Sequence, residues 1–68
     1  MNNKLLVEVD TLAKFLRNKY PQLREGQSFM SALNEINPDL YKEITGTDAD
    51  CFYDDSKTPE FFDKILNS

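Results

Sequence analysis

Apolar residues recur every three or four positions along most of the chain, which is the spacing of one face of an α-helix. The pattern over residues 5–20 predicts one long helix that ends at Pro21, because the residue before a proline avoids helical backbone. Asp10 could instead cap a shorter helix and leave residues 5–9 extended. The apolar stripe consists of Leu5, Val9, Leu12, Phe15 or Leu16, and Tyr20.

A second helical pattern spans residues 22–37. Its start is expected between Leu23 and Ser28, since Gly26 weakens a helical turn by up to about 1 kcal/mol. The apolar face of this helix consists of Phe29, Met30, Leu33 and Ile36.

Two further helices carry clear signals at their ends. Asn37 is a good N-cap, Pro38 suits the first helical position, and Gly46 fits a left-handed C-terminal stop. In the last segment Thr58 is expected to cap and Pro59 to open a helix whose apolar residues are Phe61, Phe62, Ile65 and Leu66. The expected fold is all-α: a compact single domain over residues 1–68, with about four short helices and an ordered acidic loop between the third and fourth.

Composition narrows the class of protein. The chain has 68 residues and is 40% hydrophobic, too apolar for a disordered protein. Cys51 is the only cysteine, which fits a reducing compartment, and no leader or membrane span is visible, so a cytoplasmic protein without membrane contact is expected. The sequence has no histidine, so Cys51 lacks the usual base and is expected to be a buried or half-buried small residue. Neither enzyme activity nor a cofactor is predicted.

Charge is unevenly distributed. Residues 1–34 carry five basic against three acidic side chains, a net +2, whereas residues 35–68 carry three against nine, a net −6. The basic patch of Lys4, Lys14, Arg17 and Arg24 is weak, and the helix after Pro38 carries Asp39 and Glu43, so direct nucleic-acid binding is not expected.

Four aspartates gather in residues 46–57, and calcium is a minor alternative for them. If Asp48 is the first ligand of an EF-hand loop, the oxygen ligand at the fifth position is replaced by Phe52. The required glycine is then replaced by Tyr53, and the required glutamate by Pro59. Only a non-standard site from Asp48, Asp50 and Asp54 remains open.

An ordered turn explains the same stretch better. Thr47 and Asp50 imitate a capping box, which would place Asp48 and Asp50 at the positive end of a short helical turn. Phe52 and Tyr53 are then expected to fold inward, while Asp54, Asp55 and Ser56 bond to nearby backbone amides. The same loop can also face a partner, and the candidate partner-binding residues are Asp48, Asp50, Tyr53, Asp54 and Asp55.

Most aromatic residues are expected in the core, namely Phe15, Phe29, Phe52, Tyr53, Phe61 and Phe62. A chain this small buries only part of its surface, so some aromatics should remain outside. Tyr20, Tyr41 and one of the pair Phe61 and Phe62 are the candidates for an exposed interface, including one for self-association.

The segment from residue 23 to 65 resembles a group of small uncharacterised proteins of bacteria and their phages. The shared pattern is LRxGQ, then AL, a proline, GTxxDxFYDD, and PxF near the end. Cys51 stands where proline is common in that group. The resemblance implies a phage or mobile-element origin and no catalytic residues. The matching residues are Leu23, Arg24, Gly26, Gln27, Ala32, Leu33, Pro38, Leu40, Ile44, Gly46, Thr47, Asp50, Phe52, Tyr53, Asp54, Asp55, Pro59 and Phe61.

Together these observations predict a non-enzymatic protein-binding module. It would be a phage or mobile-element accessory protein that docks on a host protein through an acidic surface. The partner could be a basic, nucleic-acid-handling protein, whose phosphate-binding surface the acidic half would occupy. The alternative is a structural or assembly protein that acts as a homo-oligomer, and the minor alternative is a calcium-binding element.

Overall fold

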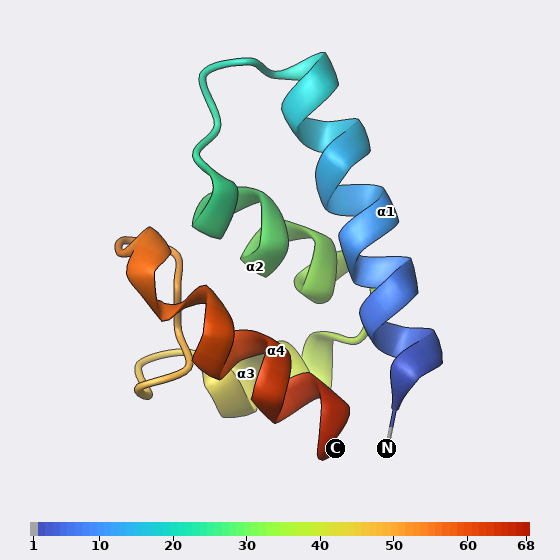
Figure 1. The fold of residues 1–68 in the computed structure, drawn as a ribbon, viewed down its shortest axis with the longest axis vertical. Coiled ribbons are helices and arrows are strands. Elements are labelled where there is room, and N and C mark those ends of the chain that lie inside the picture. The colour runs from blue at the N-terminus through green and yellow to red at the C-terminus, as the bar shows by residue number, and fades with distance from the viewer. Residues whose placement is uncertain (1) are drawn as a thin grey trace.

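The computed structural model describes residues 2–68, and within them every regular element is a helix (Figure 1). The predicted all-α fold is therefore confirmed. The elements are α1 (Asn3–Lys19), α2 (Glu25–Ile36), α3 (Pro38–Ile44), the short 3₁₀ turn η1 (Asp55–Lys57) and α4 (Thr58–Leu66).

Helix α1 is one unbroken helix, as the longer of the two alternatives predicts. Its first turn is capped by the Asn2 side chain, which accepts the Leu5 N–H at 3.2 Å. Asp10 lies within the helix and forms an ion pair with Lys14 at 2.9 Å, so the alternative in which Asp10 caps a shorter helix is wrong.

Helices α2 and α3 also begin as predicted. α2 starts at Glu25, inside the expected interval, and the Arg24 N–H donates to Gln27 Oε1 at 3.0 Å. Asn37 caps α3 by accepting the Leu40 N–H at 3.2 Å. Gly46 follows α3 with φ of 81°, the left-handed stop that the sequence indicates.

The start of α4 differs from the prediction, because Thr58 is not its N-cap. Thr58 is the first residue of the helix, is buried, and donates its backbone N–H to the Asp55 carbonyl. The preceding turn η1 runs directly into α4, so no free helix end exists at Thr58. Asp54 caps η1 instead, with its side chain accepting the Ser56 N–H.

Helix α1 packs against both α2 and α4, and α2 also packs against α3, so the core lies among the four helices. Phe29 of α2 is central, with ring centroids 5.8 Å from Phe61 and 4.9 Å from Phe62. The Asn2 N–H donates to the Leu66 carbonyl at 2.8 Å, so the two ends of the described chain meet (Figure 1). The buried apolar residues are Leu5, Val9, Ala13, Phe29, Met30, Ala32, Leu33, Leu40, Ile44, Cys51, Phe61 and Ile65.

The aromatic residues divide differently from the prediction. Phe15 is 57% exposed and Tyr53 is 84% exposed, so their assignment to the core is wrong. Leu16, not Phe15, continues the inner stripe of α1 and packs on the core. Tyr20 is exposed as expected, whereas Tyr41 is partly buried against the core, contrary to the prediction.

The sequence predicts that one of Phe61 and Phe62 is exposed, and the two side chains do differ in burial. Phe61 is fully buried and Phe62 is half-buried at the edge of the core. Phe62 thereby leaves part of its ring beside α1, on the surface.

Candidate functional site

The acidic loop, defined as residues 46–57, is ordered by its own side chains. Asp50 accepts the Gly46 N–H at 2.9 Å and the Phe52 N–H at 3.0 Å, so both of its carboxylate oxygens are used. Thr47 Oγ1 accepts the Ala49 N–H at 3.2 Å and donates to the Ile44 carbonyl at 2.6 Å. These bonds fix the loop without any ligand.

The predicted capping box is wrong. The Thr47 hydroxyl bonds to Ala49, two residues on, and the Asp50 carboxylate reaches Gly46 rather than Thr47. The Asp50 N–H bonds to the Thr47 carbonyl at 3.1 Å, which closes a single turn instead of starting a helix. Gly46 has already turned the chain into the left-handed region, so the following residues form turns.

Three contacts attach the inner side of the loop to the start of α2. Asp55 Oδ1 accepts the Gly26 N–H at 2.9 Å, and the Arg24 guanidinium donates to the Phe52 carbonyl at 3.0 Å. The Cys51 thiol lies 3.5 Å from the Gly26 carbonyl. Asp55 thus places a negative charge at the positive N-terminal end of α2, where helices favour anions. Its carboxylate bonds to this distant amide, whereas the sequence analysis expects nearby ones.

Gly26 makes this attachment possible. A Cβ at this position would overlap the Cys51 carbonyl oxygen and lie 2.9 Å from the Cys51 carbonyl carbon. Two backbone segments therefore touch where only glycine leaves room. This role is not predicted from the sequence, although a glycine in the first turn of a helix is a signal that could indicate it.

Cys51 is completely buried beneath the loop, in agreement with the expectation of a buried or half-buried small residue. Burial, together with the smaller effect of the nearby carboxylates of Asp50 and Asp55, raises the pKa of the Cys51 thiol to about 12. The thiol therefore stays protonated at neutral pH and is a poor nucleophile.

The outer side of the loop presents Tyr53 between exposed carboxylates. The Tyr53 ring meets Phe52 edge to face at 4.8 Å, but only Phe52 packs against the core. The expected inward position of Tyr53 is wrong, because the Arg24 bond and the buried Cys51 set the path of the loop so that Phe52 alone faces inward.

Asp54 follows Tyr53 in the loop, and its carboxylate is ionised at neutral pH. Its carboxylate accepts the Ser56 N–H at 3.0 Å and the Ser56 hydroxyl at 2.6 Å, as expected for a local turn. The Ser56 hydroxyl, followed by its amide, lowers the pKa of Asp54 below its usual value of 3.8. Asp48 is also exposed.

The candidate partner-binding residues therefore form two groups. Asp50 and Asp55 accept hydrogen bonds that fix the path of the loop, while Asp48, Tyr53 and Asp54 are exposed and the Asp54 carboxylate bonds only to Ser56. We call Asp48, Tyr53 and Asp54 the outer loop surface. Across residues 2–68, no three cysteine or carboxylate side chains come together as a group that could hold a metal ion.

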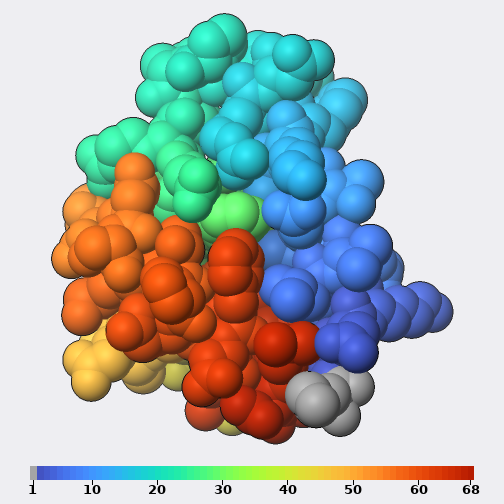
Figure 2. Space-filling view, in the orientation of Figure 1, coloured from blue at the N-terminus to red at the C-terminus, as the bar shows by residue number. Residues whose placement is uncertain are grey.

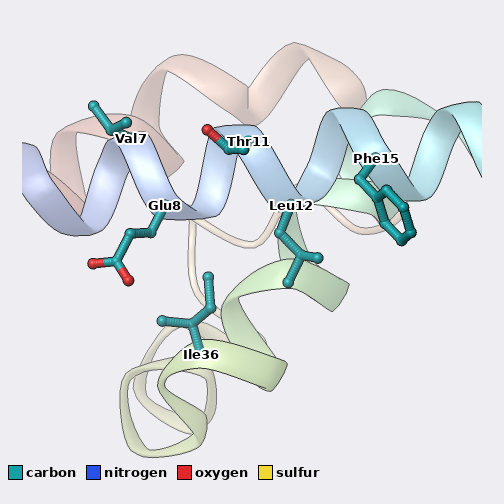
Figure 3. A pocket seen from close by; sticks show the side chains of 6 residues that line it. All are labelled: Val7, Glu8, Thr11, Leu12, Phe15 and Ile36. Carbon is teal, nitrogen blue, oxygen red and sulfur yellow. The ribbon is translucent and has the colours of Figure 1, made fainter.

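A second surface, which the sequence analysis did not predict, lies on α1. Val7 is 63% exposed and Phe15 is 57% exposed, with Thr11 between them on the same side of the helix. Beside them is an open hollow of about 500 Å³ whose lining also includes Leu12 and Ile36 (Figure 3). We call Val7, Thr11, Leu12, Phe15 and Ile36 the outer α1 face.

A smaller hollow of about 320 Å³ adjoins Val7 on its other side. It is lined by Leu6, Val7, Asp10 and Phe62. Val7 therefore forms a ridge between two shallow depressions, of which the one beside Phe15 is the larger.

Comparison with protein-family models, with curated proteins and with solved structures gives no match. The resemblance to bacterial and phage proteins therefore stays a prediction. Over residues 2–68, none of the helices combines the length and the apolar character needed to cross a membrane.

Proposed function

We propose that the protein is a non-enzymatic binding module that docks on a basic protein through the outer loop surface. The observation that carries this proposal is Tyr53, which is 84% exposed on a loop held by side-chain hydrogen bonds. Tyrosine is enriched among residues that dominate binding energy. A fixed loop also loses little conformational entropy when it binds, which favours affinity.

Charge indicates the kind of partner. Residues 35–68 carry a net −6, and Asp48 and Asp54 lie exposed in this half. A basic surface would be attracted over a Debye length of about 8 Å at physiological salt. A nucleic-acid-handling protein of a bacterial host fits this description, with the chain acting as a phage or mobile-element accessory protein that occupies its phosphate-binding surface.

A binding role also fits the chemistry of the chain better than catalysis does. The sequence contains no histidine, and the one thiol is buried and held in its protonated form. The carboxylates of Asp50 and Asp55 are engaged by backbone amides of the fold. We therefore propose no reaction.

Affinity capture from a bacterial lysate tests the proposal. The wild-type chain, Tyr53→Ala, and the double variant Asp48→Asn with Asp54→Asn are compared at low and high salt, with mass spectrometry of the retained proteins. Tyr20→Ala is the matched control, because Tyr20 is exposed but lies at the end of α1. We expect a basic protein that the wild type and the control retain at low salt and that both loop variants lose. Equal retention by all four chains would contradict the proposal.

A further inference from the structure

We propose that the outer α1 face of one copy receives the outer loop surface of a second copy, so that the chain associates head to tail. This inference rests on the proposed function, because it uses the same exposed Tyr53. It names one partner of that surface, a second copy of this chain, and it assigns a role to the hollow beside Phe15.

Tyr53 and the hollow on α1 are complementary in chemical character. The hollow of about 500 Å³ has apolar walls from two helices, with Leu12 of α1 and Ile36 of α2 pointing toward each other and Phe15 at one end (Figure 3). Glu8 lines the same hollow and supplies a carboxylate at its edge. A tyrosine has an apolar ring and a hydroxyl that needs a hydrogen-bond partner, so such a hollow suits it.

The hollow has two lysines beyond its ends and one acid, Glu8, in its lining, whereas the outer loop surface is acidic. Lys4 and Lys19 are exposed on α1, four residues before Glu8 and four residues after Phe15, so each lies about one helical turn beyond the hollow. The outer loop surface brings Asp48 and Asp54 beside its tyrosine.

Charge also selects between two ways of pairing copies. If two α1 faces met each other, both copies would bring the same two lysines and one Glu8, so the excess of positive charge would be doubled. The head-to-tail arrangement instead sets Lys4 and Lys19 against Asp48 and Asp54. Complementary potentials of this kind favour the correct partner and discourage the like-charged one.

The two surfaces lie on opposite sides of the molecule. In Figure 1 the acidic loop, drawn in yellow and orange, is at the left, and α1, drawn in blue, is at the right. The space-filling view keeps the same separation, with other residues between them (Figure 2). One copy therefore cannot place its own loop on its own α1, and a contact between unlike surfaces produces open chains or rings rather than a closed dimer.

The size of the contact limits its strength. The surface area of the chain is 4352 Å². A standard interface of about 800 Å² per partner would take roughly a fifth of this area, which is more than one tyrosine and its flanks cover. We therefore expect a weak association, with a dissociation constant above about 10 μM.

Sedimentation of the purified chain over a wide concentration range tests the inference. For the wild type we expect an average mass that rises above twice 7.9 kDa at the highest concentrations and falls when salt is added. Tyr53→Ala removes the ring that is inserted, and Phe15→Ala removes one side of the hollow. Both side chains are largely exposed, so circular dichroism should show intact helices in both variants. Each variant alone should stay at the monomer mass.

Mixing the two variants gives the decisive result. Tyr53→Ala retains an intact hollow and Phe15→Ala retains an intact loop, so an equimolar mixture should form a dimer and nothing larger. The control Lys42→Ala, at an exposed position on α3 that belongs to neither surface, should associate as the wild type does. The inference is overturned by a wild type of constant 7.9 kDa mass, by association of Tyr53→Ala equal to that of the wild type, or by a mixture that stays monomeric while the wild type associates.

The same variants separate this inference from the proposed function. If the wild type is monomeric but captures a basic protein that Tyr53→Ala loses, the proposed function stands and self-association fails. If the chains associate head to tail and capture no other protein, the second copy is the partner and the basic host protein is not.

Discussion

Asp54 and Asp55 are neighbours in the sequence but hold very different parts of the molecule together. Asp55, on the inner side of the acidic loop, accepts an N–H from Gly26, which lies 29 positions earlier. Asp54, on the outer side, bonds only to Ser56, two positions later. The inner side thus joins the loop to α2, whereas the outer side shapes a local turn and leaves Tyr53 in solvent.

This difference shows that acidic composition does not by itself define a binding surface. Of the five candidate residues, Asp50, Asp54 and Asp55 all accept hydrogen bonds within the fold, and only Asp55 reaches α2. Their charges still contribute to the negative field, but their geometry serves the stability of the loop. Substitutions at the inner side of the loop, and then at its outer side, test this difference.

Replacing Gly26 with alanine should have the largest effect. The new Cβ would overlap the Cys51 carbonyl oxygen, and neither backbone segment can move away without breaking the contact between loop and helix. We expect the free energy of unfolding, measured with urea, to fall by about 3 kcal/mol.

Gly46→Ala is the matched control for this substitution. A Cβ at Gly46 meets no atom within 4 Å, and the cost comes only from the left-handed backbone, with φ of 81°. We expect a loss of about 1–2 kcal/mol there. An equal or larger loss for Gly46→Ala would contradict the importance of the close approach at Gly26.

Alkaline pH should destabilise the fold through Cys51. Burial raises the pKa of this thiol from 9.0 to about 12, so the folded state holds a proton that the unfolded state releases. The stabilisation is complete below pH 9 and is lost as the pH rises toward 12. By linkage the loss is about 2 kcal/mol at pH 10.5.

Urea unfolding between pH 8 and 10.5 measures this loss. Cys51→Ala should remove the part of the slope that belongs to the thiol, because alanine has no proton to release. If the two chains show parallel pH profiles, the thiol does not titrate as its burial requires.

Removing the Asp55 side chain should have a smaller effect. Asp55→Ala leaves the Gly26 N–H without its carboxylate and removes a favourable charge from the start of α2. We expect a loss of about 1 kcal/mol in the free energy of unfolding. Asp48→Ala, on the outer side, should be indistinguishable from the wild type, and a comparable loss there would remove the distinction between the two sides.

Ser56→Ala should have the smallest effect, which concerns ionisation more than stability. The Ser56 hydroxyl is the main cause of the lowered pKa of Asp54, so its removal should move that pKa upward toward 3.8. Because the folded pKa is lowered, the contribution of Asp54 to stability is present above pH 3.8 and is lost as the pH falls through the folded value. An NMR titration of the Asp54 carboxyl in both chains measures the shift.

The helices were predictable because their signals are local. Asn37, Pro38 and Gly46 act on residues within one turn, and the structure confirms the role of each. The start of α4 was not predicted correctly at Thr58, since a 3₁₀ turn followed by a helix has no separate end to recognise.

The site was less predictable because its contacts join distant segments. The contact of Gly26 with Cys51 and Asp55 spans more than twenty residues, and no periodicity reports such a pair. Phe15 and Tyr53 were assigned to the core because they are aromatic, although their direction depends on how α1 and the loop pack. The order of the loop could be foreseen from its aspartates, whereas its two sides could not.

The hydrogen bond from Asn2 to Leu66 closes the polypeptide into a nearly complete ring. A short peptide could join the ends of the described chain without disturbing α1 or α4. Such a cyclised chain would lose less conformational entropy on folding. It would also carry no end near the acidic loop or the hollow on α1, so both surfaces could be engineered on a scaffold without free ends.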